Sequence, residues 1–215
     1  MITQNRGRFI VIDGPDGAGK GEQIRRLKTN LTELYPERTF VFTREPGGSP
    51  YAEDIRRLIF AEEGRKASGA TLAQLFGAAR FDHIEKVILP QLEMGAVVIT
   101  DRFDASTYAY QIVAQVGGEG ATQFFMLQRK LIEQAIGSWM TIILDVDAQT
   151  AMQRAANRTG QERTHFDERK EAFHEMVRHG YESYARQYSN VSIVDTCRSI
   201  DEVHKDVLSL LQGVL

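Results

Sequence analysis

The chain has 215 residues, 42% hydrophobic and 26% charged, which is typical of a globular protein rather than a disordered one. Its formal net charge of -3 argues against binding of a nucleic acid polymer. No apolar run reaches the roughly 20 residues that span a bilayer, so we expect no membrane association. The single cysteine, Cys197, and a start unlike a signal peptide predict a cytoplasmic protein.

Short apolar segments bounded by turn signals are predicted β-strands. The expected strands are residues 8–13, 39–45, 96–101, 141–146 and 191–195. The first, "RFIVID", stops at a glycine cluster, and a helix then begins near Lys20. In that helix Ile24, Leu27, Leu31 and Leu34 repeat at helical spacing. The second strand, "TFVFTRE", ends in the turn signal "PGGSP".

The later helical patterns lie between the remaining strands and after the last one. The expected helices are residues 52–60, 71–95 with a kink at Pro90, about 122–136, 148–157, 167–188 and 199–212. A glycine-rich loop is expected at residues 115–120, "QVGGEG".

This alternation predicts an α/β fold of three layers, in which a five-stranded parallel sheet is flanked by helices. Residues 1–215 are expected to form one domain. In such sheets, ligands bind at the carboxyl ends of the strands. The polar residues at those ends are Asp13, Arg44, Glu45, Asp101 and Arg102, and we expect the functional site there.

The segment "GPDGAGKG" between the first strand and the first helix has the pattern of a phosphate-binding loop. Its glycines turn backbone N–H groups toward a phosphate, and the helix N-terminus adds positive potential. An ordinary glycine-rich turn is the alternative, but the strand, the helix and the lysine position all favour a P-loop NTPase. The predicted nucleotide-binding residues are Gly14, Pro15, Asp16, Gly17, Ala18, Gly19, Lys20 and Gly21.

Charged residues at two other strand ends fit phosphate chemistry. Asp101 matches the acidic residue that works with Mg²⁺ in P-loop enzymes, although a strand-end aspartate alone is more often a cap or turn residue. Arg102 beside it is well placed to neutralise a phosphate. Arg44 would point into the same crevice; the alternative is a surface arginine before a turn.

Two helical sets have both a functional and a structural interpretation. Phe76 and Arg80 share a helix face and suit a nucleobase, but spacing alone favours a core phenylalanine and a solvated arginine. Arg154, Arg158 and Arg163 suit a closing loop that stabilises phosphoryl transfer, whereas a solvated helix face is the commoner use of such a run.

Together, "DGPDGAGKG", "FTREPGG", "LFGAARFDH", "ITDRFDASTYAYQ" and "TIILDV", in this order, resemble the thymidylate kinase family over nearly the whole chain. The resemblance implies a kinase that transfers the γ-phosphate of ATP to dTMP, giving dTDP, with Mg²⁺. It also implies a homodimer and a small lid at about residues 154–168.

The resemblance assigns catalytic roles to Lys20, Asp101, Arg102, Arg158 and Arg163. Lys20 would contact the ATP phosphates, Asp101 would organise Mg²⁺ and its waters, and Arg158 and Arg163 would be the lid arginines. Gly17 lies where some relatives have a catalytic arginine, and its identity fits the family type whose arginines are in the lid.

On the acceptor side, the resemblance places Asp16 near the 3′-hydroxyl of dTMP, and Arg44 and Arg102 on its phosphate. Phe76 would stack on thymine and Arg80 would contact the edge of the base. The residues implied to contact base and sugar are Thr107, Tyr110 and Gln111, with Tyr110 disfavouring a 2′-hydroxyl.

The chain departs from the family pattern after Lys20, where Gly21 and Glu22 replace the usual hydroxyl residues. A carboxylate near the phosphates would repel them unless it turns outward or meets the hydrated metal, so we expect weakened ATP affinity or unusual metal dependence. Tyr108 is also bulky, and the segment "IVAQVGGEGATQ" looks long. Two alternatives therefore stay open: a kinase for another, possibly base-modified, deoxynucleoside monophosphate, and a catalytically silent nucleotide-binding protein.

Overall fold

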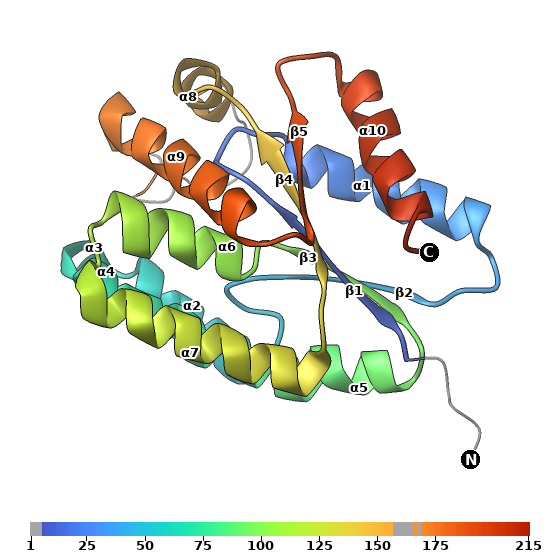
Figure 1. Ribbon diagram of the computed structural model, residues 1–215, viewed down its shortest axis with the longest axis horizontal. Coiled ribbons are helices and arrows are strands. Elements are labelled where there is room, and N and C mark those ends of the chain that lie inside the picture. The colour runs from blue at the N-terminus through green and yellow to red at the C-terminus, as the bar shows by residue number, and fades with distance from the viewer. Residues whose placement is uncertain (1–5, 157–165, 167–168) are drawn as a thin grey trace.

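In the computed structural model, which describes residues 6–156, 166 and 169–215, a five-stranded sheet lies between layers of helices (Figure 1). All neighbouring strands are parallel, in the order β2-β3-β1-β4-β5. The predicted α/β fold is confirmed, and every strand boundary falls within one residue of its prediction. The strands are β1 (Arg8–Asp13), β2 (Phe40–Arg44), β3 (Val97–Asp101), β4 (Met140–Asp145) and β5 (Val191–Asp195).

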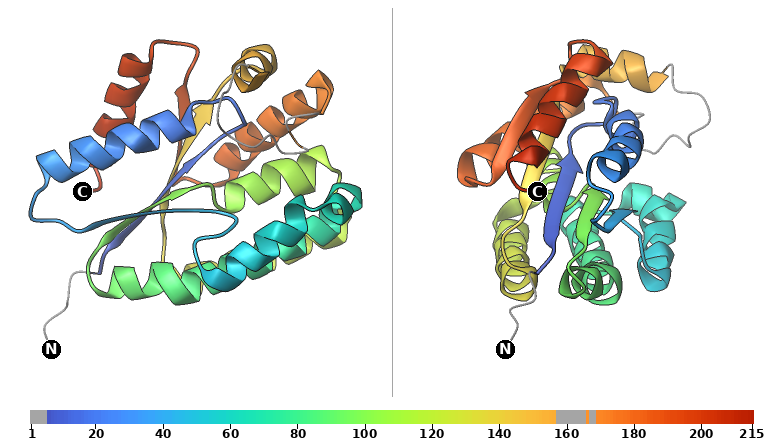
Figure 2. Two further views of the ribbon diagram at one scale, coloured as in Figure 1. Left: turned by 180° about the vertical axis from the view of Figure 1, so that it is seen from behind. Right: turned by 90° about the vertical axis from the view of Figure 1, so that its right-hand side faces the viewer.

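Helices cover both faces of the sheet, with α1 and α10 on one face and α5 and α7 on the other (Figures 1 and 2). None of the helices in the described ranges is long and apolar enough to cross a bilayer. The helices are α1 (Lys20–Leu34), α2 (Pro50–Phe60), α3 (Glu62–Lys66), α4 (Gly69–His83), α5 (Leu89–Glu93), α6 (Asp104–Thr107), α7 (Gly118–Ile136), α8 (Ala148–Ala156), α9 (Glu171–Gln187) and α10 (Ile200–Gln212), with the π-helical segments η1 (Ile84–Ile88) and η2 (Tyr108–Ala114).

The alternation of side chains along β1 explains the two layers. Ile10 and Ile12 are buried with Leu27 of α1 and Val207 of α10. Phe9 and Val11 belong to a second apolar cluster on the opposite face of the sheet. Residues of η1, α5 and α7 cover that face. Successive residues of a strand point to opposite faces, so a strand apolar at every position must be covered on both.

A third apolar cluster lies beyond one end of the sheet and connects α2, α4, η2 and α9. Here η2 and α9 approach closely, because a Cβ added at Gly180 would lie 2.7 Å from the Cα of Ala109. Glycine is therefore required at this crossing. The cluster supports the side chains that face the carboxyl ends of the strands.

The strand register brings those carboxyl ends level with one another. Asp101 of β3 pairs with Ile12 of β1 on one side and with Arg44 of β2 on the other. The phosphate-binding loop after β1 therefore lies beside the residues that follow β2 and β3.

Two predicted segments differ from the structure. The helix expected at residues 71–95 is divided into α4, η1 and α5, and Pro90 lies in the first turn of α5. Proline has no N–H to donate to the preceding turn, and the chain widens into a π-helix just before it. The glycine-rich loop expected at residues 115–120 is partly helical, because α7 begins at Gly118, four residues before the predicted start.

Candidate active site

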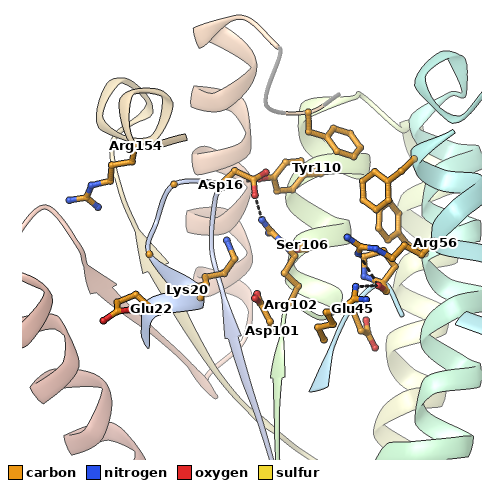
Figure 3. Close-up of a pocket in the computed structure, with 18 of the residues that line it drawn as sticks. Asp16, Lys20, Glu22, Glu45, Arg56, Asp101, Arg102, Ser106, Tyr110 and Arg154 are labelled. Carbon is orange, nitrogen blue, oxygen red and sulfur yellow. Dashed lines mark hydrogen bonds and ion pairs between the residues drawn. The ribbon is translucent and has the colours of Figure 1, made fainter. Parts of the chain in front are cut away.

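A cavity of about 920 Å³ opens at the carboxyl ends of β1, β2 and β3 (Figure 3). It joins the phosphate-binding loop to side chains from α2, α4 and η2. The predicted site residues that line it are Asp16, Gly17, Gly19, Lys20, Gly21, Arg44, Phe76, Asp101, Arg102, Tyr110 and Gln111. The structure therefore brings together, in one cavity, residues that are far apart in the sequence.

The loop between β1 and α1 has the glycine-dependent geometry that its sequence predicts. Gly14, Gly17 and Gly19 all have positive φ angles, of 138°, 84° and 88°. A Cβ at Gly14 would lie 2.3 Å from the carbonyl oxygen of Leu144, and one at Gly17 would lie 2.3 Å from that of Ala151. Larger residues would push the loop away from β4 and α8, so its shape depends on these glycines.

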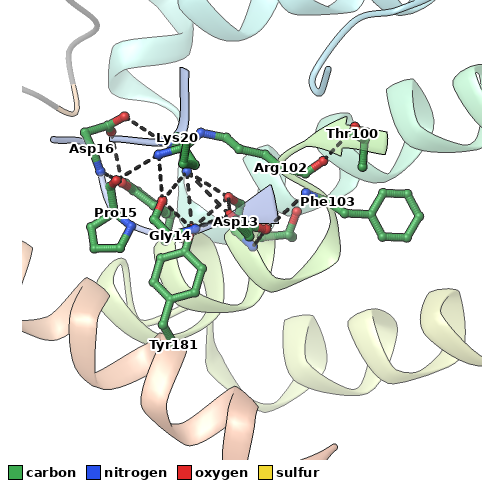
Figure 4. A network of polar contacts seen from close by, with 12 residues as sticks. Asp13, Gly14, Pro15, Asp16, Lys20, Thr100, Arg102, Phe103 and Tyr181 are labelled. Carbon is green, nitrogen blue, oxygen red and sulfur yellow. Dashed lines mark hydrogen bonds and ion pairs between the residues drawn. The ribbon is translucent and has the colours of Figure 1, made fainter. Parts of the chain in front are cut away.

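Lys20 is buried at the start of α1, with its ammonium group directed into the loop. Its Nζ donates hydrogen bonds to the carbonyl oxygens of Gly14 at 2.9 Å and Pro15 at 2.8 Å (Figure 4). Burial lowers the pKa of Lys20 to about 8, with a further contribution from the positive charge of Arg102. A phosphate beside this ammonium would favour the charged form and raise the pKa of Lys20, because an opposite charge stabilises it.

Arg102 connects the end of β3 to the phosphate loop. It has the left-handed φ of 69°, which is uncommon for a residue with a side chain. Its guanidinium donates to Asp16 Oδ1 at 2.5 Å and to the carbonyl oxygen of Gly14 at 2.9 Å. Burial alone would lower the pKa of Arg102, but the neighbouring Asp16 outweighs it and the pKa lies well above its usual value.

The carboxylate of Asp16 is also held by Tyr110, whose hydroxyl donates to Oδ2 at 2.9 Å. The guanidinium of Arg102 lies 5.5 Å from the centre of the Tyr110 ring. Asp16, Arg102 and Tyr110 therefore form one connected group, in which a loop residue, a strand-end arginine and a residue of η2 fix one another.

Two aspartates at strand ends have different environments. Asp101 lines the cavity, and burial raises the pKa of its carboxyl, an effect that nearby Lys20 and Arg102 oppose. Its Oδ1 is buried and has no hydrogen-bond partner in the described structure. This oxygen is suited to a hard cation or its waters.

Asp13, by contrast, lies outside the lining of the cavity, although its position at the end of β1 suggested a place in the site. It is fully buried and accepts hydrogen bonds from the backbone N–H groups of Gly14, Phe103 and Ser106. Tyr181 of α9 also donates to it, at 2.7 Å (Figure 4). Asp13 holds the phosphate loop against the chain that follows β3.

Phe76 of α4 and Gln111 of η2 also line the cavity. Phe76 is partly buried. The side chain of Gln111 is almost fully buried, and its Nε2 has no hydrogen-bond partner in the described ranges. A flat ring and an unused amide donor are suited to the face and the edge of a nucleobase.

Arg80 and Thr107 do not line the cavity directly. Arg80 is 2% exposed, so the spacing-based interpretation of a solvated arginine is wrong. Its Nε donates to Glu45 Oε2 at 2.8 Å, and a terminal nitrogen donates to Thr107 Oγ1 at 3.0 Å. The other carboxylate oxygen of Glu45 lies 3.1 Å from His83 Nδ1. Glu45 itself lines the cavity, and Arg80, Thr107 and His83 form a buried layer behind it.

Arg44 and Arg56 face the cavity from β2 and α2. Arg44 also donates to Glu53 at 2.9 Å, and Arg56 donates to the carbonyl oxygen of Pro46 at 3.0 Å. The Glu45–Pro46 peptide bond is cis. Burial lowers the pKa of Arg56, and the positive charge of Arg44 adds to the effect.

Sequence reasoning missed Arg56, although a helical pattern contained the signal. Arg56 follows the buried Ile55 and lies four residues after the buried Ala52, at the edge of the buried face of α2. Its neighbour Arg57 points to solvent and pairs with Asp54. The other cavity-lining residues that were missed are Arg25, Pro46, Phe60, Ser106 and Phe166.

Glu22 also lines the cavity, but its carboxylate points away from Lys20 and Asp101 (Figure 3). It accepts hydrogen bonds from Arg25 and Arg26, and these interactions lower its pKa to about 2. The outward orientation that would relieve repulsion of a phosphate is therefore present, and two positive groups offset the charge.

The comparisons with known proteins agree with this geometry. The family described as thymidylate kinase matches residues 12–207. Thymidylate kinase of Symbiobacterium thermophilum is 41% identical over 208 residues, 96% of this chain and 94% of that protein. That of Caulobacter vibrioides is 42% identical over 202 residues, 92% of each chain. The crystal structure of thymidylate kinase from Ehrlichia chaffeensis has a TM-score of 0.71 at 30% identity, over 96% of this chain and 99% of the other.

The chain belongs to the thymidylate kinase family. It is therefore a kinase, and the P-loop NTPase fold expected from its sequence is confirmed. The two arginines that the family resemblance assigns to the lid, Arg158 and Arg163, lie outside the described residues. Arg154, which precedes them, lines the cavity and donates to the carbonyl oxygen of Thr196 at 3.0 Å.

Proposed function

We propose that this protein transfers the γ-phosphate of ATP to dTMP, giving dTDP and ADP. The observation that carries the proposal is a cavity whose lining joins Lys20 and the phosphate loop to Phe76 of α4 and Gln111 of η2. An acceptor base against Phe76 and a donor phosphate against Lys20 would leave the acceptor phosphate between them, beside Arg102. Membership of the thymidylate kinase family supports the same substrates.

In the proposed reaction, an oxygen of the dTMP phosphate attacks the γ-phosphorus of ATP as the bond to the β-phosphate oxygen breaks. Transfer of this kind depends on positioning and on stabilising charge spread over the transferred group. Lys20 would neutralise the donor phosphates, and Arg102 and Arg44 would hold the acceptor phosphate. Asp16 and Tyr110 would fix Arg102 and face the sugar, while Phe76 would stack on the base.

Mg²⁺ belongs to the proposal, and the residues present fit it. The unpartnered Oδ1 of Asp101 lies in a wall that also contains Lys20 and Arg102, and oxygen is the ligand atom that Mg²⁺ prefers. When bound, the ion would offset negative charge on the donor phosphates. Asp101 would orient the ion, directly or through water. It would do so without help from a Ser or Thr hydroxyl, because position 21 is a glycine.

Arg80 and Thr107 enter the proposal through the layer behind the cavity. Arg80 would reach the base edge or hold the surface against which the base lies, with Thr107 and Glu45 fixing its guanidinium. Arg158 and Arg163 remain predicted lid arginines, in a lid at about residues 154–168 of one domain.

The alternatives left open by the sequence have less support. Tyr108, which raised doubt about base specificity, packs against Phe125 and Tyr184 rather than lining the cavity. The silent-protein alternative depended on Glu22, whose charge Arg25 and Arg26 offset. A kinase for a different deoxynucleoside monophosphate remains the second candidate, because a flat ring and one amide donor do not select a particular base.

A homodimer in the cytoplasm completes the proposal. The helix α4 lies between α2 and α7, and both outer helices carry exposed apolar side chains. Phe124, Leu127 and Leu131 share a face of α7, and Leu58 is exposed on α2. Such surfaces favour association. The lone cysteine, Cys197, is exposed and has no possible intrachain disulfide partner, which suits a reducing compartment.

The test is ADP release from ATP and Mg²⁺ with a panel of acceptors: dTMP, dUMP, dGMP, dAMP, dCMP and the ribonucleotides. We expect the highest kcat/KM with dTMP, and no turnover by a Lys20→Ala variant. Preference for another acceptor would keep the mechanism and replace the substrate. ADP binding without turnover of any acceptor would overturn the proposed function.

A further inference from the structure

The first turn of α1 lacks the hydroxyl groups that usually follow the P-loop lysine. Gly21 and Glu22 stand there, and no serine or threonine occurs between Lys20 and Gln23. A Cβ added at Gly21 would meet no atom within 4 Å. Packing therefore does not require glycine at this position, and the missing hydroxyl leaves room for another group to contact the donor phosphates.

Arg25, one turn further along α1, also lines the cavity. Its Nε and a terminal nitrogen donate to the two carboxylate oxygens of Glu22, at 2.9 and 2.7 Å. The side chain of Arg25 is 67% exposed, and Glu22 is its hydrogen-bond partner in the described structure. An exposed pair of this kind contributes little stability, so a competing anion can replace the carboxylate.

Arg26 holds Glu22 independently of Arg25. Its Nε donates to Glu22 Oε1 at 2.7 Å, and a terminal nitrogen donates to Asp201 of α10 at 2.6 Å. Arg26 is therefore anchored between two carboxylates and less exposed than Arg25. If Arg25 turned toward a phosphate, Glu22 would keep one positively charged partner.

We propose that Arg25 is a ligand of the donor nucleotide's phosphates, and that Glu22 holds its guanidinium at the cavity until the phosphates replace the carboxylate. A guanidinium binds phosphate through paired N–H groups, and it would compensate for the absent hydroxyl at Gly21. The inference rests on the proposed function in one respect, namely that the donor is a nucleoside triphosphate.

A simpler role for Arg25 would be to screen the charge of Glu22 without touching the nucleotide. The two roles predict different nucleotide affinities when residue 22 carries no charge. In the Glu22→Gln background no carboxylate needs screening, so only a direct phosphate contact makes a further Arg25→Ala change weaken nucleotide binding. The experiment is calorimetric measurement of the Kd for ADP and for adenosine, with wild type, Glu22→Gln, and Glu22→Gln combined with Arg25→Ala.

We expect the double variant to bind ADP roughly tenfold more weakly than Glu22→Gln, the size of one charge-assisted hydrogen bond. Adenosine, which has no phosphate, should bind both variants equally. Lys28→Ala in the Glu22→Gln background is the matched control, because Lys28 lies on α1 but does not line the cavity. It removes one positive charge and should leave the Kd for ADP unchanged.

Equal ADP affinity of Glu22→Gln with and without Arg25 would overturn the inference and leave a screening role. An equal loss for Lys28→Ala would also overturn it, because only the net charge would then matter. Failure of the proposed function is seen separately, as absence of dTMP turnover by the wild-type enzyme, and it does not alter the comparison of ADP affinities.

Discussion

Arg102 at the end of β3 donates a 2.5 Å hydrogen bond to Asp16 in the phosphate-binding loop, and this contact joins the two halves of the cavity. Asp16 belongs to the loop that would hold the donor, whereas Arg102 would hold the acceptor phosphate. A strand-end arginine that is fixed by the donor loop positions the acceptor relative to the donor. Positioning of this kind is a main source of catalysis in phosphoryl transfer.

We expect Asp16→Asn to lower kcat with dTMP by roughly a hundredfold, the typical cost of disturbing one transition-state contact. The neutral amide would no longer hold the charge of Arg102, although the bond of Arg102 to Gly14 would remain. Steady-state kinetics with ATP and dTMP measure the effect. Asp54→Asn, on the exposed side of α2, is the matched control and should retain wild-type kinetics. Unchanged turnover by Asp16→Asn would contradict a positioning role for this contact.

Lys20 predicts a pH dependence of donor binding. Its pKa of about 8 in the free protein means that the ammonium loses its proton as the pH rises through that value. Bound phosphates favour the charged form and raise the pKa in the complex, so affinity is full below about pH 8 and falls above it. We expect ADP to bind about tenfold more weakly at about pH 9 than at about pH 7.

Calorimetric titration with ADP across this range measures the change. Lys20→Met removes the titrating group, so its weaker binding should be independent of pH over the same range. A wild-type Kd that does not change across the range would show that Lys20 keeps its proton in the free protein.

Phe76 predicts a specific loss of acceptor binding. Stacking of a base on an aromatic side chain contributes about 1–3 kcal/mol, so we expect Phe76→Ala to raise the KM for dTMP at least about fivefold. The KM for ATP is the internal control and should change little, because Phe76 belongs to α4 and not to the phosphate-binding loop. Phe76→Tyr keeps the ring and should restore most of the affinity. Equal effects on both substrates would indicate a general packing role.

The buried layer behind the cavity predicts a loss of stability. Glu45 connects Arg80 and His83, and all three side chains are almost fully buried. Removing one partner of a buried ion pair typically costs about 3–5 kcal/mol, so we expect Glu45→Ala to lower the free energy of unfolding by about that amount. Urea denaturation measures it. Glu53→Ala, which removes a partly exposed partner of Arg44, should cost at most about 1 kcal/mol. Similar losses for both variants would argue against a special role for the buried layer.

The exposed apolar face of α7 predicts the oligomeric state. We expect the wild type to sediment as a dimer and Leu127→Glu combined with Leu131→Glu to sediment as a monomer, because two charges would be buried in the interface. Lys205→Glu changes a charge on the exposed side of α10, which covers the other face of the sheet, and should leave the dimer intact. A monomeric wild type would refute the homodimer.

Local pattern predicted most of the fold. Each strand is short, apolar and followed by a turn signal, and such segments have few alternatives in a chain that alternates with helices. The clearest difference between the predicted and the observed helices lies where an apolar helical pattern and a proline occur in the same segment. At residues 84–93 the helical pattern continues through Pro90, and the segment is helical with a π-helical turn while Ile84, Ile88 and Leu92 pack in one apolar cluster with Val98 of β3.

The site was predicted less completely than the fold. Lys20, Asp101 and Arg102 follow from the ends of strands, because a parallel sheet places those ends together. Arg80 was predicted to be solvated on spacing alone, whereas its real environment comes from Glu45 and Thr107, which lie 35 and 27 residues away in the chain. A helical pattern shows which face a residue occupies, but not which distant partner meets that face.

The sequence by itself determined the parallel sheet, the phosphate-binding loop and the kinase family, because these depend on local periodicity and on short motifs whose glycines and lysine have only a few workable geometries. Tertiary structure alone decided which charges meet. It paired Arg102 with Asp16, placed Asp13 behind the loop instead of in the cavity, and paired Arg80 with Glu45. The physical reason is that the energy of a charge depends on its burial and on partners within a few ångströms, and both are set by contacts between segments distant in the chain.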